Sequence, residues 1–141
     1  MAKKIVLDCD PGNDDALGII VALGSDNLSL QAVTTGAGHL AYDRTFKNAC
    51  ITIAQIGNLN IPVSKGAENP LVRDRLIAKV LDLTSGLDSD RTDLNSIDPD
   101  GRNSIQLMYD IITDNPGITI VTTGPLTNLA MLFILYPKLK S

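Results

Sequence analysis

Residues 5–24 read IVLDCDPGNDDALGIIVALG and predict the first strand, loop and helix of the chain. The apolar and β-branched run 5–7 stops at an acidic turn that contains proline and glycine, as is typical of a buried strand that delivers a loop. From residue 14 to residue 23 most positions are apolar, and Gly24 follows, which indicates a helix packed into the core and ended by glycine. The stretch therefore predicts a strand–loop–helix unit.

The same alternation continues along the chain. Further strands are predicted over residues 28–35, 61–64 and 118–122. Further helices are predicted over residues 43–56, 72–83, 105–112 and 126–135. This rhythm favours an α/β, Rossmann-like fold, with a mostly parallel sheet and helices on both faces. The length of 141 residues fits a single domain over residues 1–141.

Composition and charge limit the partners and the location that are expected for the chain. The net charge is -4 and no basic cluster is denser than Lys3-Lys4, so a nucleic-acid-binding surface is not expected. No apolar run approaches the roughly 20 residues of a membrane-spanning helix, and the N-terminus lacks a signal-peptide core, so a cytoplasmic protein is expected. The two cysteines, Cys9 and Cys50, have no CxxC spacing and are expected to be reduced thiols in or near the core.

Two segments depart from the regular pattern. Residues 84–103 are rich in Ser, Asp, Asn, Gly and Arg and predict a long loop, which is either an active-site flap or a disordered segment. Residues 129–135 read LAMLFIL and are apolar on every side of the predicted helix. Such a helix expects cover on all faces, which a truncated chain or burial in a homo-oligomer would explain.

Four aspartates surround the first loop. Asp8 and Asp10 are two apart at the end of a strand, so both side chains point to one face. Asp14 and Asp15 begin the following helix, where the helix dipole favours negative charge. Carboxylates gathered in one volume favour a hard divalent cation, and carboxylates mixed with backbone carbonyls suit calcium better than magnesium. The alternative is that Asp14 caps the helix while the other acids are solvated.

Residues 6–16, VLDCDPGNDDA, resemble the DxDPGxDD signature at the N-terminus of the inosine-uridine-preferring nucleoside hydrolase family. Three further stretches resemble the same family in the same order: TTGAG at 34–38 ahead of NA at 48–49, GAENPL at 66–71, and TTGPLTNLA at 122–130. The resemblance spans essentially the whole chain. It implies the N-terminal half of a nucleoside hydrolase, since family members are about twice as long.

The resemblance also implies roles for single residues. Asp10 and Asp15, with the backbone carbonyl of Thr123, would bind calcium, and Asp14 would hold the ribose hydroxyls. Asp10 would also take the proton of a calcium-bound water that cleaves the N-glycosidic bond of a nucleoside, giving ribose and free base. Asp8 would support the loop as a hydrogen-bond acceptor behind the ligands.

The chain departs from the family pattern at three places. His39 stands where the family usually has asparagine; it is either structural or a substrate contact at the rim of the site. Asp82 and Leu83 replace a His-Gly pair, and only the SGL of residues 85–87 keeps that pattern, so no base preference is predicted. The family's second half, which supplies another calcium-binding aspartate and assists the leaving base, is absent.

Three functions follow as alternatives. The first is a ribonucleoside hydrolase in which this chain holds most of the metal site. The second is a non-catalytic, shortened homologue that folds and binds a cation or ribose weakly. The third is a phosphatase of the haloacid-dehalogenase type with Asp8 as nucleophile, although Pro11-Gly12 and the Asp14-Asp15 pair fit that class poorly.

Overall fold

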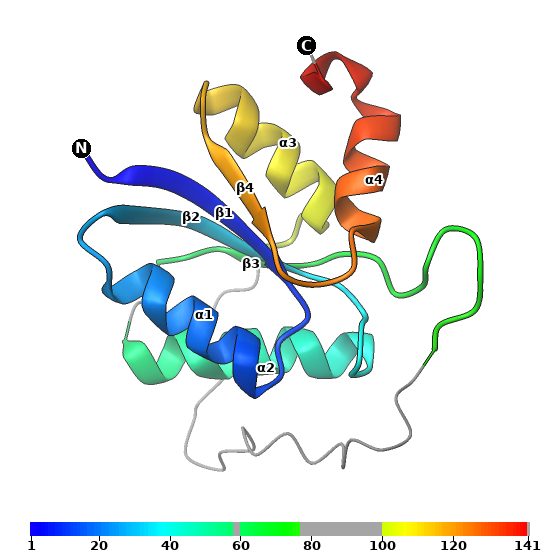
Figure 1. The fold of residues 1–141 in the computed structure, drawn as a ribbon, viewed down its shortest axis with the longest axis horizontal. Coiled ribbons are helices and arrows are strands. Elements are labelled where there is room, and N and C mark those ends of the chain that lie inside the picture. The colour runs from blue at the N-terminus through cyan, green and yellow to red at the C-terminus, as the bar shows by residue number, and fades with distance from the viewer. Residues whose placement is uncertain (58–59, 77–99, 141) are drawn as a thin grey trace.

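The computed structural model describes residues 1–57, 60–76 and 100–140, and Figure 1 shows the chain as a three-layer α/β unit. In chain order the elements are β1 (Lys3–Cys9), α1 (Asn13–Gly24), β2 (Leu28–Thr35), α2 (Tyr42–Ile56), β3 (Val63–Lys65), α3 (Ser104–Asp114), β4 (Thr119–Thr122), α4 (Thr127–Leu135) and the 3-10 turn η2 (Pro137–Lys140).

The four strands form one sheet in the order β3-β2-β1-β4, and each described pairing is parallel. Helices α1 and α2 cover one face, and α3 and α4 cover the other (Figure 1). The α/β fold class with helices on both faces is therefore confirmed. Because all strands run in the same direction, their carboxyl ends meet at one edge of the sheet, where open α/β folds bind ligands.

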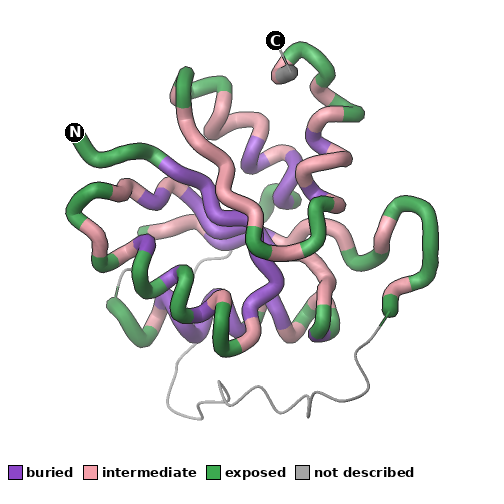
Figure 2. The backbone as a smooth tube through the Cα atoms, in the orientation of Figure 1, coloured by how far each residue is buried: buried purple, intermediate pink, exposed green. Residues whose placement is uncertain are grey.

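The core consists of two apolar layers on either side of β1 and β2, the most deeply buried strands in Figure 2. Alternate residues of β1 enter opposite layers: Leu7 packs against Ile19 of α1, whereas Val6 packs in the layer that holds Met108 of α3 and Leu132 of α4. Burial on both faces explains why β1 is continuously apolar from Ile5 to Leu7, after its two exposed lysines.

The pairing of β1 with β2 contains one irregularity. Ile5 pairs with Leu30 and Val6 pairs with Ala32, so Gln31 is an extra residue in β2. Its side chain bonds back to Ser29, with Nε2 donating to the backbone oxygen at 3.1 Å and lying 2.8 Å from the hydroxyl. Beyond this bulge the register is regular and places Thr34 opposite Asp8.

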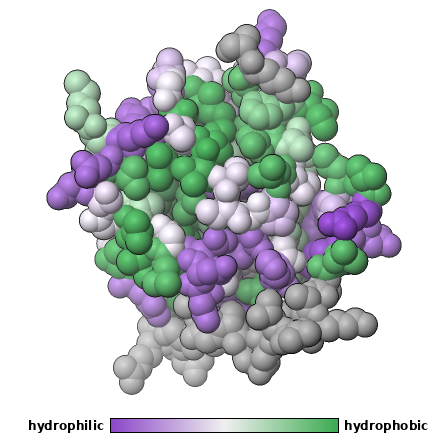
Figure 3. Space-filling view, viewed as in Figure 1, coloured by the Kyte–Doolittle hydropathy of each residue, from purple (hydrophilic) through white to green (hydrophobic). Residues whose placement is uncertain are grey.

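The two edges of the sheet differ. The outer side of β3 receives a backbone hydrogen bond from Asp100 N to Val63 O, at 3.1 Å. At the other edge, β4 pairs with β1 alone within the described part of the chain, and its four residues are all partly exposed. Figure 3 shows this side of the molecule, with hydrophobic side chains gathered around β4 and on the neighbouring helices.

The predicted helix over 72–83 is wrong where it can be compared. Residues 72–76 are not helical, and residues 77–83 lie outside the described part of the chain. A short helix needs an apolar face packed on the protein, but here Val72 is 96% and Leu76 is 72% exposed, so no such packing holds these residues. Residues 100–103 are irregular, as the predicted loop requires, and residues 84–99 of that loop lie outside the described range.

Cys9 and Cys50 are both free and buried, as expected. Burial raises the pKa of the Cys50 thiol to about 11 and that of Cys9 well above its ordinary value, so both thiols stay protonated at neutral pH. The last helix is apolar as predicted and only partly covered, since Leu132 is fully buried whereas Ile134 and Leu135 are exposed. Among the described residues, no helix is both long and apolar enough to cross a membrane.

Candidate functional site

The predicted acidic loop lies at the carboxyl edge of the sheet, where connections from all four strands meet. Backbone hydrogen bonds link these connections: Gly36 N donates to Cys9 O at 3.2 Å, Gly66 N to Thr35 O at 2.7 Å, and Thr123 N to Asp8 O at 2.9 Å. The edge is thus a connected rim rather than four independent loops.

Asp10 is the centre of this rim and is only 8% exposed. Its Oδ2 accepts a hydrogen bond from the backbone N of His39 at 3.1 Å, and the Nδ1 atom of His39 lies 3.4 Å from the same oxygen. Burial raises the pKa of the Asp10 carboxyl above its ordinary value, and the contacts with His39 oppose that shift.

Two glycines allow the backbone to approach Asp10 closely. A Cβ at Gly38 would overlap Asp10 Oδ2, and one at Gly124 would lie 2.6 Å from Asp10 Oδ1. Any larger residue would displace the carboxylate at either position. The loops after β2 and β4 therefore form a cradle around Asp10 that only glycine permits.

Asp15 and α2 fix the turn that follows Asp10. Asp15 Oδ2 accepts a hydrogen bond from Asp10 N at 2.9 Å, and Asn48 Nδ2 of α2 donates to Pro11 O at 2.7 Å. Gly12 is the N-cap of α1 and no side chain caps that helix, so Asp14 does not have the capping role of the alternative reading. Asp14 is exposed at the start of α1 and faces solvent.

Asp8 is oriented away from solvent and is only 2% exposed. Its Oδ1 accepts hydrogen bonds from Thr34 Oγ1 at 2.7 Å and from Asn128 Nδ2 at 2.8 Å. Burial raises the pKa of Asp8 to about 6, although these two hydrogen bonds favour the ionised form. A phosphatase nucleophile must meet a phosphate ester, so this enclosed carboxylate argues against the phosphatase alternative.

The donor set suits a hard cation, but it is a partial set. Asp10 and Asp15 supply oxygen atoms, and Thr123 enters the rim beside Asp8, next to the Gly124 that contacts Asp10. Within residues 1–57, 60–76 and 100–140, no three His, Cys, Asp or Glu side chains lie close enough together to hold a metal. A calcium ion here would need the Thr123 carbonyl and further oxygen donors.

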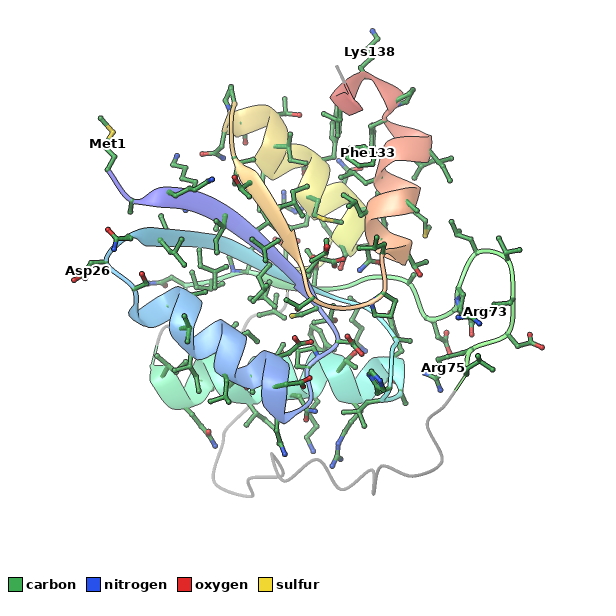
Figure 4. The ribbon with its side chains drawn as sticks, viewed as in Figure 1. Met1, Asp26, Arg73, Arg75, Phe133 and Lys138 are labelled. Carbon is green, nitrogen blue, oxygen red and sulfur yellow. The ribbon has the colours of Figure 1, made fainter. Side chains whose placement is uncertain are left out.

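The outer rim is formed by His39 and the segment after β3. The His39 side chain is 70% exposed, so the ring lies over Asp10 on the solvent side. Arg75 Nη1 donates to Leu40 O at 3.3 Å, which connects the two loops (Figure 4). Asp82, Leu83 and residues 85–87, where the chain departs from the family pattern, lie outside the described residues.

Sequence reasoning gave no role to several residues that hold the rim together. Gly38, Asn48 and Thr34 are among them, and Asn128 is the most connected. A signal for Asn128 was present, because it is a polar residue directly before the apolar stretch LAMLFIL, in the first turn of the predicted helix. A buried amide in such a helix needs partners, and these partners are distant in sequence.

Comparison with known proteins places the chain in one family. The model of the inosine-uridine preferring nucleoside hydrolase family matches residues 5–141. The pyrimidine-specific ribonucleoside hydrolase RihA of Shewanella woodyi is 42% identical over 142 residues, which cover 100% of this chain and 46% of that protein. RihA of Enterobacter sp. is 39% identical, with 99% and 45% covered.

Solved structures agree as well. The plant nucleoside hydrolase PpNRh1 superposes with a TM-score of 0.84 at 32% identity, over 98% of this chain and 44% of that chain. The purine-preferring ribonucleoside hydrolase from Gardnerella vaginalis gives a TM-score of 0.84 at 26% identity, over 98% and 45%. The chain therefore spans less than half the length of the relatives it matches, as the resemblance to one half of the family implied. It belongs to the inosine-uridine preferring nucleoside hydrolase family.

Proposed function

We propose that the chain carries the metal-binding and ribose-binding part of a ribonucleoside hydrolase, an enzyme that cleaves the N-glycosidic bond of a nucleoside to ribose and free base. The observation that carries the proposal is Asp10, a buried carboxylate held in a glycine cradle at the carboxyl edge of the sheet, with Asp15 bonded to its backbone. Family membership supplies the class of reaction.

In this proposal Asp10 and Asp15 hold calcium together with the Thr123 carbonyl. When bound, calcium would make a water more acidic and fix the sugar hydroxyls. Asp10 accepts the proton of the attacking water. Asp14, which is exposed at the start of α1, binds the ribose hydroxyls. The exposed ring of His39 contacts the substrate at the rim, and Asp8 supports the loop from behind.

The reaction needs a second proton. When water adds to the sugar carbon, the N-glycosidic electron pair leaves with the base, which has to be protonated at nitrogen. The residues assigned to the site in this chain take a proton but supply none to the base. Leaving-group protonation by a general acid is worth roughly 10²- to 10⁴-fold, so we expect the chain alone to lack full activity.

A second candidate is a non-catalytic, shortened homologue that folds and binds a cation or ribose weakly. It is favoured by the partial donor set within the described residues. The two candidates share one metal-binding step and differ in whether addition of the missing groups restores turnover.

The proposed substrates are ribonucleosides as a class, because matched proteins include both pyrimidine-specific and purine-preferring enzymes by name. We also propose self-association through the open edge of β4 and the exposed Ile134 and Leu135 of α4, which leave apolar surface uncovered. A cytoplasmic location stays a prediction from the sequence.

Calcium titration by calorimetry tests the proposal. We expect micromolar binding to the 141-residue chain and loss of binding in Asp10→Ala, since that change removes one of two carboxylate ligands. Asp26→Ala is the matched control: Asp26 is an exposed aspartate between α1 and β2, far from the site at the other end of the sheet (Figure 4).

Three results would be decisive. Binding that Asp10→Ala abolishes and Asp26→Ala preserves would support the metal site. Equal binding in all three proteins would mean adventitious association with surface acids. No binding at millimolar calcium would contradict the proposal and leave a family fold without its chemistry.

A further inference from the structure

Asn128, in the first turn of α4, is 1% exposed and bonds to three separate segments at the carboxyl edge of the sheet. Its Nδ2 donates to Asp8 Oδ1 at 2.8 Å and to Thr35 O at 3.2 Å. Its Oδ1 accepts a hydrogen bond from Ala67 N at 2.7 Å. One amide group thus contacts the ends of β1 and β2 and the loop after β3.

The backbone around Asn128 is shaped to receive it. A Cβ at Gly66 would overlap the Asn128 amide group, and one at Gly36 would lie 3.4 Å from Asn128 Nδ2. Glycine at residue 66 is therefore required by close approach of the amide. Three of the sequence stretches that resemble the family, at 34–38, 66–71 and 122–130, thus meet at this one side chain.

The segment that carries Asn128 is tied twice to Asp8. The Asn128 side chain bonds the Asp8 carboxylate, and Thr123 N bonds the Asp8 backbone oxygen at 2.9 Å. Between Thr123 and Asn128 lies Gly124, whose backbone contacts Asp10. Movement of Asn128 would therefore shift the residue 123–124 backbone relative to Asp10.

From this geometry we infer that Asn128 is a positioning residue, an amide clasp that sets the spacing between Asp10 and the Thr123–Gly124 backbone by joining β1, β2, the loop after β3 and α4. Its effect on metal binding rests on the function proposed above, whereas the clasp itself does not. The amide group supplies two N–H donors, for Asp8 and Thr35, together with the oxygen that accepts from Ala67 N.

Asn128→Asp tests the clasp with almost no change in shape. The variant replaces the donor to Asp8 with a carboxylate oxygen, and repulsion between the two carboxylates is expected to move residue 128 away from Ala67 N. Asn103→Asp is the matched control, because Asn103 caps α3 by accepting a hydrogen bond from Gln106 N at 2.9 Å, a bond that aspartate can also accept.

Two measurements on the folded 141-residue chain separate positioning from simple stability. Calcium affinity by calorimetry is expected to fall by about tenfold or more in Asn128→Asp, as for other groups that orient ligands, and to stay unchanged in Asn103→Asp. Amide hydrogen exchange at Ala67, followed by NMR without calcium, is expected to speed up in Asn128→Asp alone. A purely structural role would lower the urea midpoint and leave the calcium affinity of the folded fraction unchanged, which would overturn the inference.

The outcomes remain distinct from those of the proposed function. If the wild type binds no calcium, the proposed function fails, and exchange at Ala67 still decides whether the clasp exists. If Asn128→Asp does not fold, Gly66→Ala replaces it, because a Cβ at residue 66 would overlap the Asn128 amide and displace it without removing any polar atom. Unchanged Ala67 exchange in a folded variant would overturn the clasp.

Discussion

Asp8 lies in β1 and Asp10 follows the end of that strand, and the two have different surroundings. Asp8 is enclosed by Thr34 and Asn128, whereas Asp10 meets the rim at His39. The different partners separate a carboxylate that holds the structure from one that lies at the rim, where we propose that it reacts. At the residue scale, the acidic signature therefore contains an internal carboxylate, Asp8, and a carboxylate at the rim, Asp10.

The raised pKa of Asp8 predicts a pH-dependent stability. The folded-state value of about 6 lies above the ordinary 3.8, so the folded protein keeps a proton that the unfolded chain has released between these values. The contribution of Asp8 to the free energy of unfolding is fully present below about pH 4 and is lost as pH rises through about 6, by on the order of 3 kcal/mol. Asp8→Asn should remove this dependence.

Urea unfolding with a chelator, at several values from about pH 4 to pH 7, checks the prediction. The stability of the wild type relative to Asp8→Asn should decline across that interval. A constant difference between the two proteins would show that Asp8 has the same pKa in the folded and unfolded states.

The sequence predicted that the four aspartates of the signature converge in one volume, but within the described residues no three such side chains lie close enough together to hold a metal. The spacing of Asp8, Asp10 and Asp15 follows from the motif, and all three lie at the predicted loop. Thr34 and Asn128, which orient Asp8, are 26 and 120 residues away along the chain. Local patterns do not encode such distant partners, so their contribution emerged only from the folded arrangement.

Predicted helices are observed where their apolar side chains can be buried against the rest of the protein. The predicted helix over 43–56 is observed as α2, with fully buried Ile51 and Ile53. The segment 72–76 has helix-compatible residues, but its apolar side chains find no cover and it stays irregular. Propensity alone does not hold a short helix, so packing decided the outcome.

At the element scale, replacing glycine by alanine at two positions is expected to change the free energy of unfolding in opposite directions. Gly18 lies inside α1 and Gly57 ends α2 with φ of 81°, and a Cβ at either site would meet nothing within 4 Å. Gly18→Ala should raise the free energy of unfolding by about 1 kcal/mol through helix propensity. Gly57→Ala should lower it by about 1 kcal/mol, because alanine disfavours the left-handed region. Chemical denaturation of both variants is the measurement, and shifts of the same sign would contradict the argument.

The two edges of the sheet are covered to different extents. The β3 edge is covered by the Asp100 backbone, whereas the β4 edge has no such bond among the described residues, and apolar side chains of α1 and α4 remain exposed near it. Open strand edges beside apolar surface favour pairing with another chain. The asymmetry locates the surface through which the proposed self-association would occur.

Light scattering after size exclusion checks this prediction. The wild type is expected to form a dimer or larger assembly at micromolar concentration, and Ile134→Asp should shift it toward the monomer by placing a charge on that surface. Val72→Asp is the control, because Val72 is also an exposed apolar residue but lies on the segment after β3. A monomeric wild type, or dissociation caused by Val72→Asp, would exclude the proposed surface.

Gln31, the extra residue of β2, has a consequence for how this strand tolerates changes in length. Leu30 and Val33 are three apart yet belong to the same apolar layer, because the bulge absorbs one residue between them. Deletion of Gln31 would restore ordinary alternation and leave Thr34 beside Asp8, whereas loss of a residue after it would exchange the two faces of the strand end. Gln31 is thus the residue of β2 whose loss is expected to leave the carboxyl edge of the sheet in place.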